Sequence, residues 1–366
     1  MRFCPNCGSK NTDDAKFCIS CGNPLDARRN TARPHPKKGN AISNFFSDYI
    51  GTNNDDLNWK ILFTDIFKSH TREEAEEIFI CGTKKTTPPP SSILSEMPKP
   101  WFYSRVFAVF SIAAVLLWIC CTSFQNSNTL PGLIMLGSLA VPLSVMIMFL
   151  ELNVWKDYSL YNVIIVFLIG GCASLVATLF IITLFPTGEL DYVGAFLTGL
   201  FEEAGKAIIV YLFLKRMHRP TILRALLIGA CVGAGFAAFE SAGYSFNCFL
   251  AGGFSFMMNN IFLRGFLAPG GHVVWAAISG AAMVITSKAA AKPIDSYIFS
   301  DSRFLRLFAI PVVLHALWDC PLCSAILPEI YAGPIFLLVC AWIVILLLIN
   351  MGLAEVAQIS RKSLNQ

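Results

Sequence analysis

The sequence predicts an all-α polytopic membrane protein with about eight transmembrane helices, preceded by a small N-terminal zinc ribbon. The first observation is composition: 55% of the 366 residues are hydrophobic and only 14% are charged, whereas soluble domains carry about 25% charged residues. The second is charge distribution, because half of the basic and half of the acidic residues lie within the first 100 positions. The rest of the chain is therefore apolar enough to reside in a bilayer.

Four closely spaced cysteines, Cys4, Cys7, Cys18 and Cys21, open the chain in the pattern Cys-x2-Cys-x10-Cys-x2-Cys. Two such pairs complete a tetrahedral zinc site, and a closed four-cysteine site is structural rather than catalytic. The segment is similar to the short zinc ribbons at microbial N-termini. We therefore expect residues 1–25 to form a zinc ribbon that holds one structural zinc. Cysteines that stay reduced to bind zinc also indicate a cytosolic N-terminus, where a cytosolic protein could be the partner of the ribbon.

Two polar segments connect the ribbon to the first apolar run. Residues 26–40 form a basic linker, and residues 41–100 form a cytosolic juxtamembrane segment that ends in a proline-rich tether. Within the second segment, Thr71 is followed three residues later by Glu74, which predicts a capping box and a helix that begins there.

Residues 101–356 contain the membrane domain, and residues 357–366 are expected to form a cytosolic tail. Each apolar run is long enough to cross a hydrocarbon core of about 30 Å at about 1.5 Å per residue. We expect spans at residues 104–122, 130–150, 159–185, 194–214, 222–247, 265–286, 304–324 and 333–354.

The loops between these spans predict their orientation, because basic residues are enriched on the cytosolic side. The loops after spans 4 and 6 and the tail after span 8 are basic, whereas those after spans 1, 3 and 7 contain no Lys or Arg. Both termini are therefore expected in the cytosol, with Arg264 as the one exception on the outer side. We expect an integral protein of a prokaryotic plasma membrane.

Ionisable residues interrupt four consecutive spans. A charge at the bilayer centre costs about 2.5–3.5 kcal/mol on insertion scales, so such groups require partners or a water-filled cavity. Counted from the outer ends of the spans, the carboxylates and histidines among them fall in one band roughly 7–14 Å deep. These residues are Glu202, Glu203, Lys206, Glu240, His272, His315 and Asp319.

Helical spacing predicts which of these side chains share a face. Glu202 and Lys206 are four residues apart, as are His315 and Asp319, so each pair can interact along its own helix. Glycines at positions 229, 233 and 235 predict close packing of the fifth span against a neighbour.

Carboxylates and imidazoles at one depth indicate hydrolysis by an activated water, with a glutamate as general base and histidines that stabilise the oxyanion. Two other functions remain open: a proton-coupled transporter, and a non-catalytic membrane receptor that signals through the ribbon. The net charge of +4 is modest and argues against a nucleic-acid partner.

The ionisable residues form four motifs that occur in order, each on its own span, over about residues 190–325: Glu202-Glu203-x-x-Lys206, Phe236-x-x-x-Glu240, His272 and His315-x-x-x-Asp319. These motifs resemble those of the PrsW family of intramembrane proteases, within the CAAX-protease and bacteriocin-processing superfamily. The resemblance implies cleavage of a membrane-anchored protein near the outer face of the bilayer, as in site-1 proteolysis of an anti-sigma factor.

Residue by residue, the resemblance implies that Glu202, Glu203, His272 and His315 are catalytic. Lys206, Phe236, Glu240 and Asp319 match supporting positions. CAAX proteases have His where Glu240 stands and Asn where Asp319 stands, so these two positions follow the PrsW pattern instead.

The need for a catalytic metal stays open at the level of sequence. His272 and His315 with Glu240 or Asp319 offer enough ligand types for zinc. A metal-free mechanism needs only the glutamate pair and histidine donors, and this is the alternative that we favour from the sequence.

If the ribbon is regulatory, Cys4→Ser and Cys7→Ser should leave intrinsic cleavage largely intact. The check is the cleavage rate of each variant beside that of the wild type. Complete loss of cleavage in folded variants would instead make the ribbon part of the catalytic unit.

Overall fold

The computed structural model describes residues 2–3, 10–12, 59–83, 85–93, 98–326 and 331–364. The chain divides into two units, Met1–Gly39 and Asn40–Gln366. In the first unit, strand β1 (Arg2–Phe3) pairs antiparallel with β2 (Lys10–Asn11). The four ribbon cysteines and the linker at residues 26–40 lie outside the described residues.

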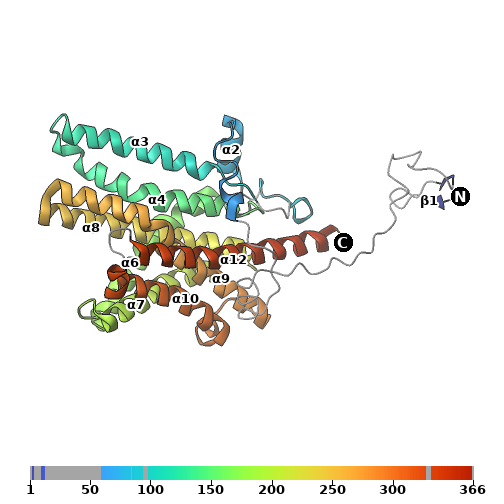
Figure 1. Cartoon of the computed structure of the whole chain (residues 1–366). Helices are drawn as coiled ribbons and strands as arrows, with labels where there is room; N and C mark the ends of the chain where they lie inside the picture. The colour runs from blue at the N-terminus through green and yellow to red at the C-terminus, as the bar shows by residue number, and fades with distance from the viewer. Residues whose placement is uncertain are drawn as a thin grey trace. The chain divides into compact units, whose positions relative to one another are not determined.

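All regular elements among the described residues of the second unit are helices (Figure 1). Short helices precede the membrane domain, and long apolar helices form it. In chain order the elements are η1 (Trp59–Phe63), α2 (Arg72–Ile80), η2 (Pro90–Ser92), α3 (Phe102–Thr122), η3 (Ser127–Thr129), α4 (Leu130–Leu152), α5 (Leu160–Ile165), η4 (Val166–Gly170), α6 (Gly171–Leu184), α7 (Tyr192–Lys215), α8 (Ile222–Leu267), η5 (Ala268–Gly270), α9 (His272–Ala290), η6 (Ser296–Ser300), α10 (Ser302–Asp319), α11 (Pro321–Ala325) and α12 (Ala332–Leu364).

Five helical stretches among the described residues are long and apolar enough to cross a membrane: Phe102–Thr122, Ser127–Leu152, Leu160–Leu184, Ile222–Ala290 and Ala332–Leu364. Large apolar side chains on their outer faces are exposed, for example Leu116 at 58% and Phe180 at 64%. Apolar surface of this extent is typical of contact with lipid. The chain is therefore an integral membrane protein.

The capping box at α2 is confirmed. Thr71 Oγ1 accepts a hydrogen bond from the Glu74 backbone N–H, and Glu74 Oε2 accepts one from the Thr71 backbone N–H, both at 3.2 Å. Two otherwise unpaired N–H groups are thereby satisfied, and the helix begins at Arg72 as expected.

Helix α8 is a hairpin of two antiparallel helical legs that reverse at Gly253. Gly253 has φ 74° and ψ −164°, a conformation that glycine adopts without the steric cost of a Cβ. Across the hairpin, Asn260 Nδ2 donates to Ser245 Oγ at 3.0 Å and Arg264 Nε donates to Ser241 Oγ at 2.8 Å. The predicted boundaries at residues 247 and 265 are therefore wrong, because the intervening residues continue the helices on both sides of the turn.

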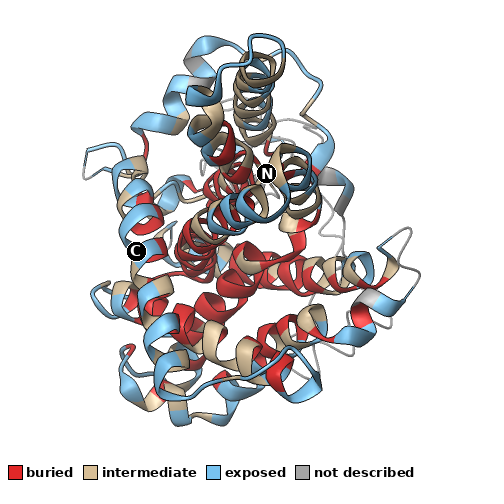
Figure 2. Ribbon diagram, turned by 90° about the vertical axis from the view of Figure 1, so that its left-hand side faces the viewer, coloured by how far each residue is buried: buried red, intermediate tan, exposed pale blue. Residues whose placement is uncertain are grey.

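The first leg of α8 packs against α9 at the centre of the membrane domain. Residues 225–238 of α8 and 273–284 of α9 are all buried (Figure 2). A Cβ at Gly229 or Gly233 would lie 2.2 Å from the carbonyl oxygen of Ala276 or His272, respectively. The predicted close approach at these glycines is confirmed, and it fixes the position of the N-terminus of α9.

A further predicted boundary is wrong. Helix α10 ends at Asp319 rather than at residue 324, because Cys320 is extended and precedes Pro321, which disfavours a helical conformation at the residue before it. Helix α12 continues to Leu364, beyond the predicted end of the last span at residue 354.

The packing at Gly233 can be tested by Gly233→Ala beside Gly243→Ala on the same leg of α8. We expect Gly233→Ala to destabilise the protein by about 1–3 kcal/mol, because its Cβ meets backbone. A Cβ at Gly243 meets nothing within 4 Å, so Gly243→Ala should be neutral or stabilising by up to about 1 kcal/mol. Thermal unfolding in detergent measures both, and equal melting temperatures would contradict this packing.

Candidate active site

Four helices bring the ionisable residues of the membrane domain together. Helix α7 contributes Glu202, Glu203 and Lys206, and α8 contributes Glu240. His272 is the first residue of α9, and His315 and Asp319 occupy the last two turns of α10. All seven are connected by hydrogen bonds or ion pairs. We call this group the ionisable cluster.

Two contacts fix helix α7 on the N-terminal side of its glutamate pair. Asp191 caps its N-terminus, where the carboxylate accepts hydrogen bonds from the backbone N–H groups of Val193 and Gly194. One turn before the glutamate pair, Gly199 packs against the backbone of α10. A Cβ at this position would lie 2.8 Å from the backbone nitrogen of Ala316. This approach brings the glutamates of α7 within reach of the histidine of α10.

Lys206 is fully buried at the centre of the cluster. Its ammonium donates to Glu203 Oε1 at 2.7 Å and to Glu202 Oε2 at 3.3 Å, and lies 2.8 Å from His272 Nδ1. An ammonium has three donors, so these contacts use its full capacity. The Phe236 ring lies 4.1 Å from the same nitrogen, in position for a cation–π contact.

His315 connects α10 to both glutamates of α7. Its Nδ1 lies 2.9 Å from Glu203 Oε1, while its Nε2 lies 3.7 Å from Glu202 and 3.4 Å from Asp319. The Trp275 ring stacks on the imidazole with ring centres 4.6 Å apart. A ring that donates from Nδ1 to Glu203 directs its Nε2 lone pair toward two carboxylates, an arrangement that a cation between them would stabilise.

His272 lies between two oppositely charged groups. Its Nε2 is 3.0 Å from Glu240 Oε2, and its Nδ1 faces the Lys206 ammonium. Phe236 packs beside the ring, with centres 5.0 Å apart. Phe236 and Glu240, four residues apart on α8, therefore both contact His272.

Glu203 has one oxygen with no partner. Its Oε1 is occupied by Lys206 and His315, whereas Oε2 is buried and has no hydrogen-bond partner among the described residues. A buried acceptor without a partner carries a substantial desolvation cost. Such an atom is suited to accept a proton during a reaction.

The sequence interpretation missed Arg264 as a member of the site. Its guanidinium reaches from the second leg of α8 to Glu240 and Ser241 on the first leg. One indication of this role was present in the sequence, because Arg264 is the one exception to the predicted cytosolic placement of the basic residues.

The cluster fits a divalent cation. Glu202, His272 and His315 each offer a ligand atom, and these atoms lie within 4.8 Å of one another. At His272 the atom left by Glu240 is Nδ1, so a cation bound there would replace its contact with the Lys206 ammonium. Two histidines and a glutamate are a known ligand set for catalytic zinc. Moreover, Glu203 and Glu240 each contact one nitrogen of a ring, as second carboxylates do behind metal-ligating histidines.

Formal charge supports the same fit. The carboxylates of Glu202, Glu203, Glu240 and Asp319 are accompanied in the contacts described by the fixed cations Lys206 and Arg264. With neutral imidazoles, two negative charges remain, which equals the charge that a divalent cation would balance.

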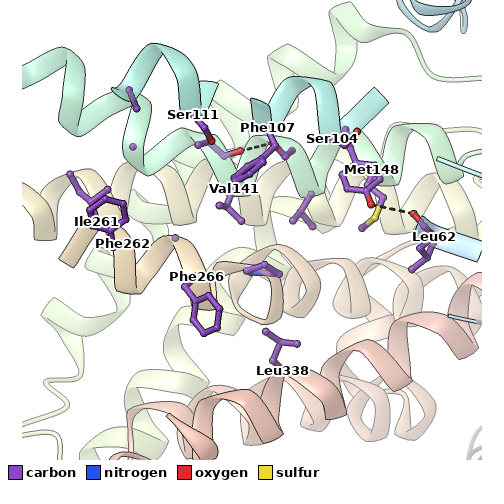
Figure 3. Close-up of a pocket in the computed structure, with 18 of the residues that line it drawn as sticks. Leu62, Ser104, Phe107, Ser111, Val141, Met148, Ile261, Phe262, Phe266 and Leu338 are labelled. Atoms are coloured by element: carbon purple, nitrogen blue, oxygen red, sulfur yellow. Dashed lines mark hydrogen bonds between the residues drawn. The ribbon is translucent and has the colours of Figure 1, made fainter. Parts of the chain in front are cut away.

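A separate apolar groove of about 1280 Å³ lies between α3, α4, the second leg of α8 and α12 (Figure 3). Phe107, Val141, Phe262 and Leu338 are among the residues that line it. No Asp, Glu, His, Lys or Arg lies among its described lining residues. The groove therefore offers no group for acid–base catalysis, and its apolar lining suits hydrocarbon.

Comparisons with known proteins give two matches. The family described as PrsW family intramembrane metalloprotease matches residues 159–349. The family described as zinc-ribbon domain matches residues 3–25. No curated protein and no solved structure matches the chain.

Lys206→Met tests the central ion pair. Because the variant leaves Glu203 buried without its cation, we expect a loss of about 3–5 kcal/mol of unfolding free energy. Lys215→Met on the same helix is the matched control, since the Lys215–Asp295 pair is exposed and should contribute little. Chemical denaturation in mixed micelles measures both variants. Equal effects of the two substitutions would contradict the buried pair.

Proposed function

The chain belongs to the PrsW family of intramembrane metalloproteases, and on that premise we propose that it hydrolyses a peptide bond of a membrane-anchored protein near the outer face of the bilayer. The observation that carries this proposal is the ionisable cluster, in which residues from four helices form one connected group. Catalysed peptide hydrolysis needs a general base for the attacking water and groups that stabilise the developing oxyanion, and the cluster contains candidates for both.

Glu202, His272 and His315 are the proposed metal ligands. A divalent cation at these residues would supply Lewis acidity that polarises the scissile carbonyl. This proposal departs from the metal-free mechanism favoured from the sequence, and the family description as metalloproteases supports the change.

Glu203 is the proposed general base. Its partner-free Oε2 would accept the proton of the attacking water, while Oε1 orients His315 through Nδ1. The Lys206 ammonium donates to Oε1 and thereby holds the Glu203 side chain in place. Glu240 orients His272, and Asp319 contributes a second carboxylate beside His315.

We propose eight membrane crossings with both termini in the cytosol of a prokaryote. The Ile222–Ala290 stretch reverses at Gly253 and therefore supplies two crossings, and α7 and α10 add two to the other four apolar stretches. Basic residues after α7 and α9 and in the last turn of α12 support this orientation. The zinc ribbon, with structural zinc on its four cysteines, would then face cytosolic partners.

The test compares membrane proteomes of cells that express the wild type, Glu203→Gln or Glu189→Gln at matched levels. Glu189→Gln is the control because Glu189 is exposed and precedes α7. We expect N-terminal fragments that end near the outer boundary of the bilayer with the wild type and with Glu189→Gln. With Glu203→Gln, loss of the base should reduce them by about 100- to 10,000-fold.

A second pair of variants repeats the comparison. His315→Ala should lose the fragments, whereas the exposed control His218→Ala should keep them. Identical proteomes for all five folded proteins would contradict proteolysis. The transporter and receptor alternatives would then take precedence, with substrate-dependent flux in vesicles as the next assay.

A further inference from the structure

Arg264 contacts the ionisable cluster from outside the four motifs. It lies on the second leg of α8, and its side chain crosses the hairpin to the first leg. There Nη2 donates to Glu240 Oε2 and Nε donates to Ser241 Oγ at 2.8 Å. The guanidinium also lies over the Tyr244 ring, 4.6 Å from its centre. Three neighbours on one helical face therefore fix its orientation.

The oxygen that Arg264 contacts is also the oxygen that faces His272. Glu240 Oε2 accepts from Arg264 and lies 3.0 Å from His272 Nε2. Because both contacts converge on one atom, the position of the guanidinium sets the position of the acceptor for the ring. We propose that Arg264 is a positioning residue of the active site, which acts on His272 through Glu240. This inference rests on the proposed function.

The contact determines which nitrogen of His272 carries the proton. With Glu240 Oε2 held in place, the ring donates from Nε2 and keeps the lone pair of Nδ1 directed toward the interior of the cluster, where Lys206 lies. Without Arg264, the Glu240 side chain loses its anchor and is free to turn away from the ring. His272 would then lose its fixed tautomer and orientation.

The chemistry requires arginine rather than another cation. A planar guanidinium donates to a carboxylate and to a hydroxyl at once, whereas an ammonium is a point charge without this fixed fork. Ser241 anchors the Nε side of the fork, and Tyr244 supports its face. These contacts also explain why a basic residue lies on the predicted outer side, where basic residues are otherwise rare.

The substrate for the test is the membrane protein whose fragment is lost with Glu203→Gln in the proteome comparison. Its cleavage is measured in proteoliposomes. The variants are Arg264→Met, Arg264→Lys, Ser241→Ala, Glu240→Gln and the double variant Arg264→Met/Glu240→Gln. Arg303→Met is the matched control, because Arg303 is exposed at the far end of α10. Ser241→Ala removes a single contact and keeps the test valid if Arg264→Met fails to fold.

We expect Arg264→Met to lower kcat by about 10- to 100-fold, the usual range for residues behind a metal ligand, with little change in KM. Arg264→Lys should recover part of the loss, Ser241→Ala should lose less, and Arg303→Met should match the wild type. The double variant should be no slower than Glu240→Gln alone, because Arg264 acts through Glu240.

Three results would overturn the proposal: full activity of Arg264→Met, a raised KM with unchanged kcat, or losses that multiply in the double variant. The last two would make Arg264 a residue that acts independently of Glu240. Failure of the proposed function is distinguishable, since it would leave the wild type itself without cleavage.

Discussion

The ion pair between Lys206 and Glu203 is the interaction on which the rest of the site depends. Both side chains are fully buried, and an isolated charge at such a position costs several kcal/mol. Other helices supply further partners for the pair: His315 of α10 contacts Glu203 Oε1, and His272 of α9 contacts the Lys206 ammonium. The requirement to compensate two buried charges thus draws α7, α9 and α10 together, and Glu240 joins them from α8 through His272.

Much of this arrangement could be predicted from the sequence, for a physical reason. An ionisable residue in an apolar helix needs a partner, so Glu202, Glu203, Lys206 and the two histidines had to meet somewhere in the bundle. Helical spacing then identified the pairs within each helix, and the glycines identified the contact between α8 and α9. The capping box at Thr71 could also be predicted, because it joins residues only three positions apart in the sequence.

What the sequence did not reveal depends on contacts across a reversal of the chain. The turn at Gly253 lies within a continuous helical pattern, so hydropathy marked the two legs of α8 without their true ends. Arg264 and Glu240 are 24 residues apart and meet because of that turn. The proposal of metal-dependent in place of metal-free hydrolysis also rests on contacts between helices. It required the geometry of Glu202, His272 and His315 and the charge that surrounds them.

The central claim is that the ionisable cluster holds a divalent cation in the active enzyme. The most direct measurement is anomalous X-ray diffraction at a metal absorption edge on crystals of cleavage-competent, full-length protein. We predict one anomalous peak at the ribbon cysteines and a second among Glu202, His272 and His315. A peak at the ribbon alone, in protein that still cleaves its substrate, would contradict the account and leave hydrolysis to the glutamates and histidines without a metal.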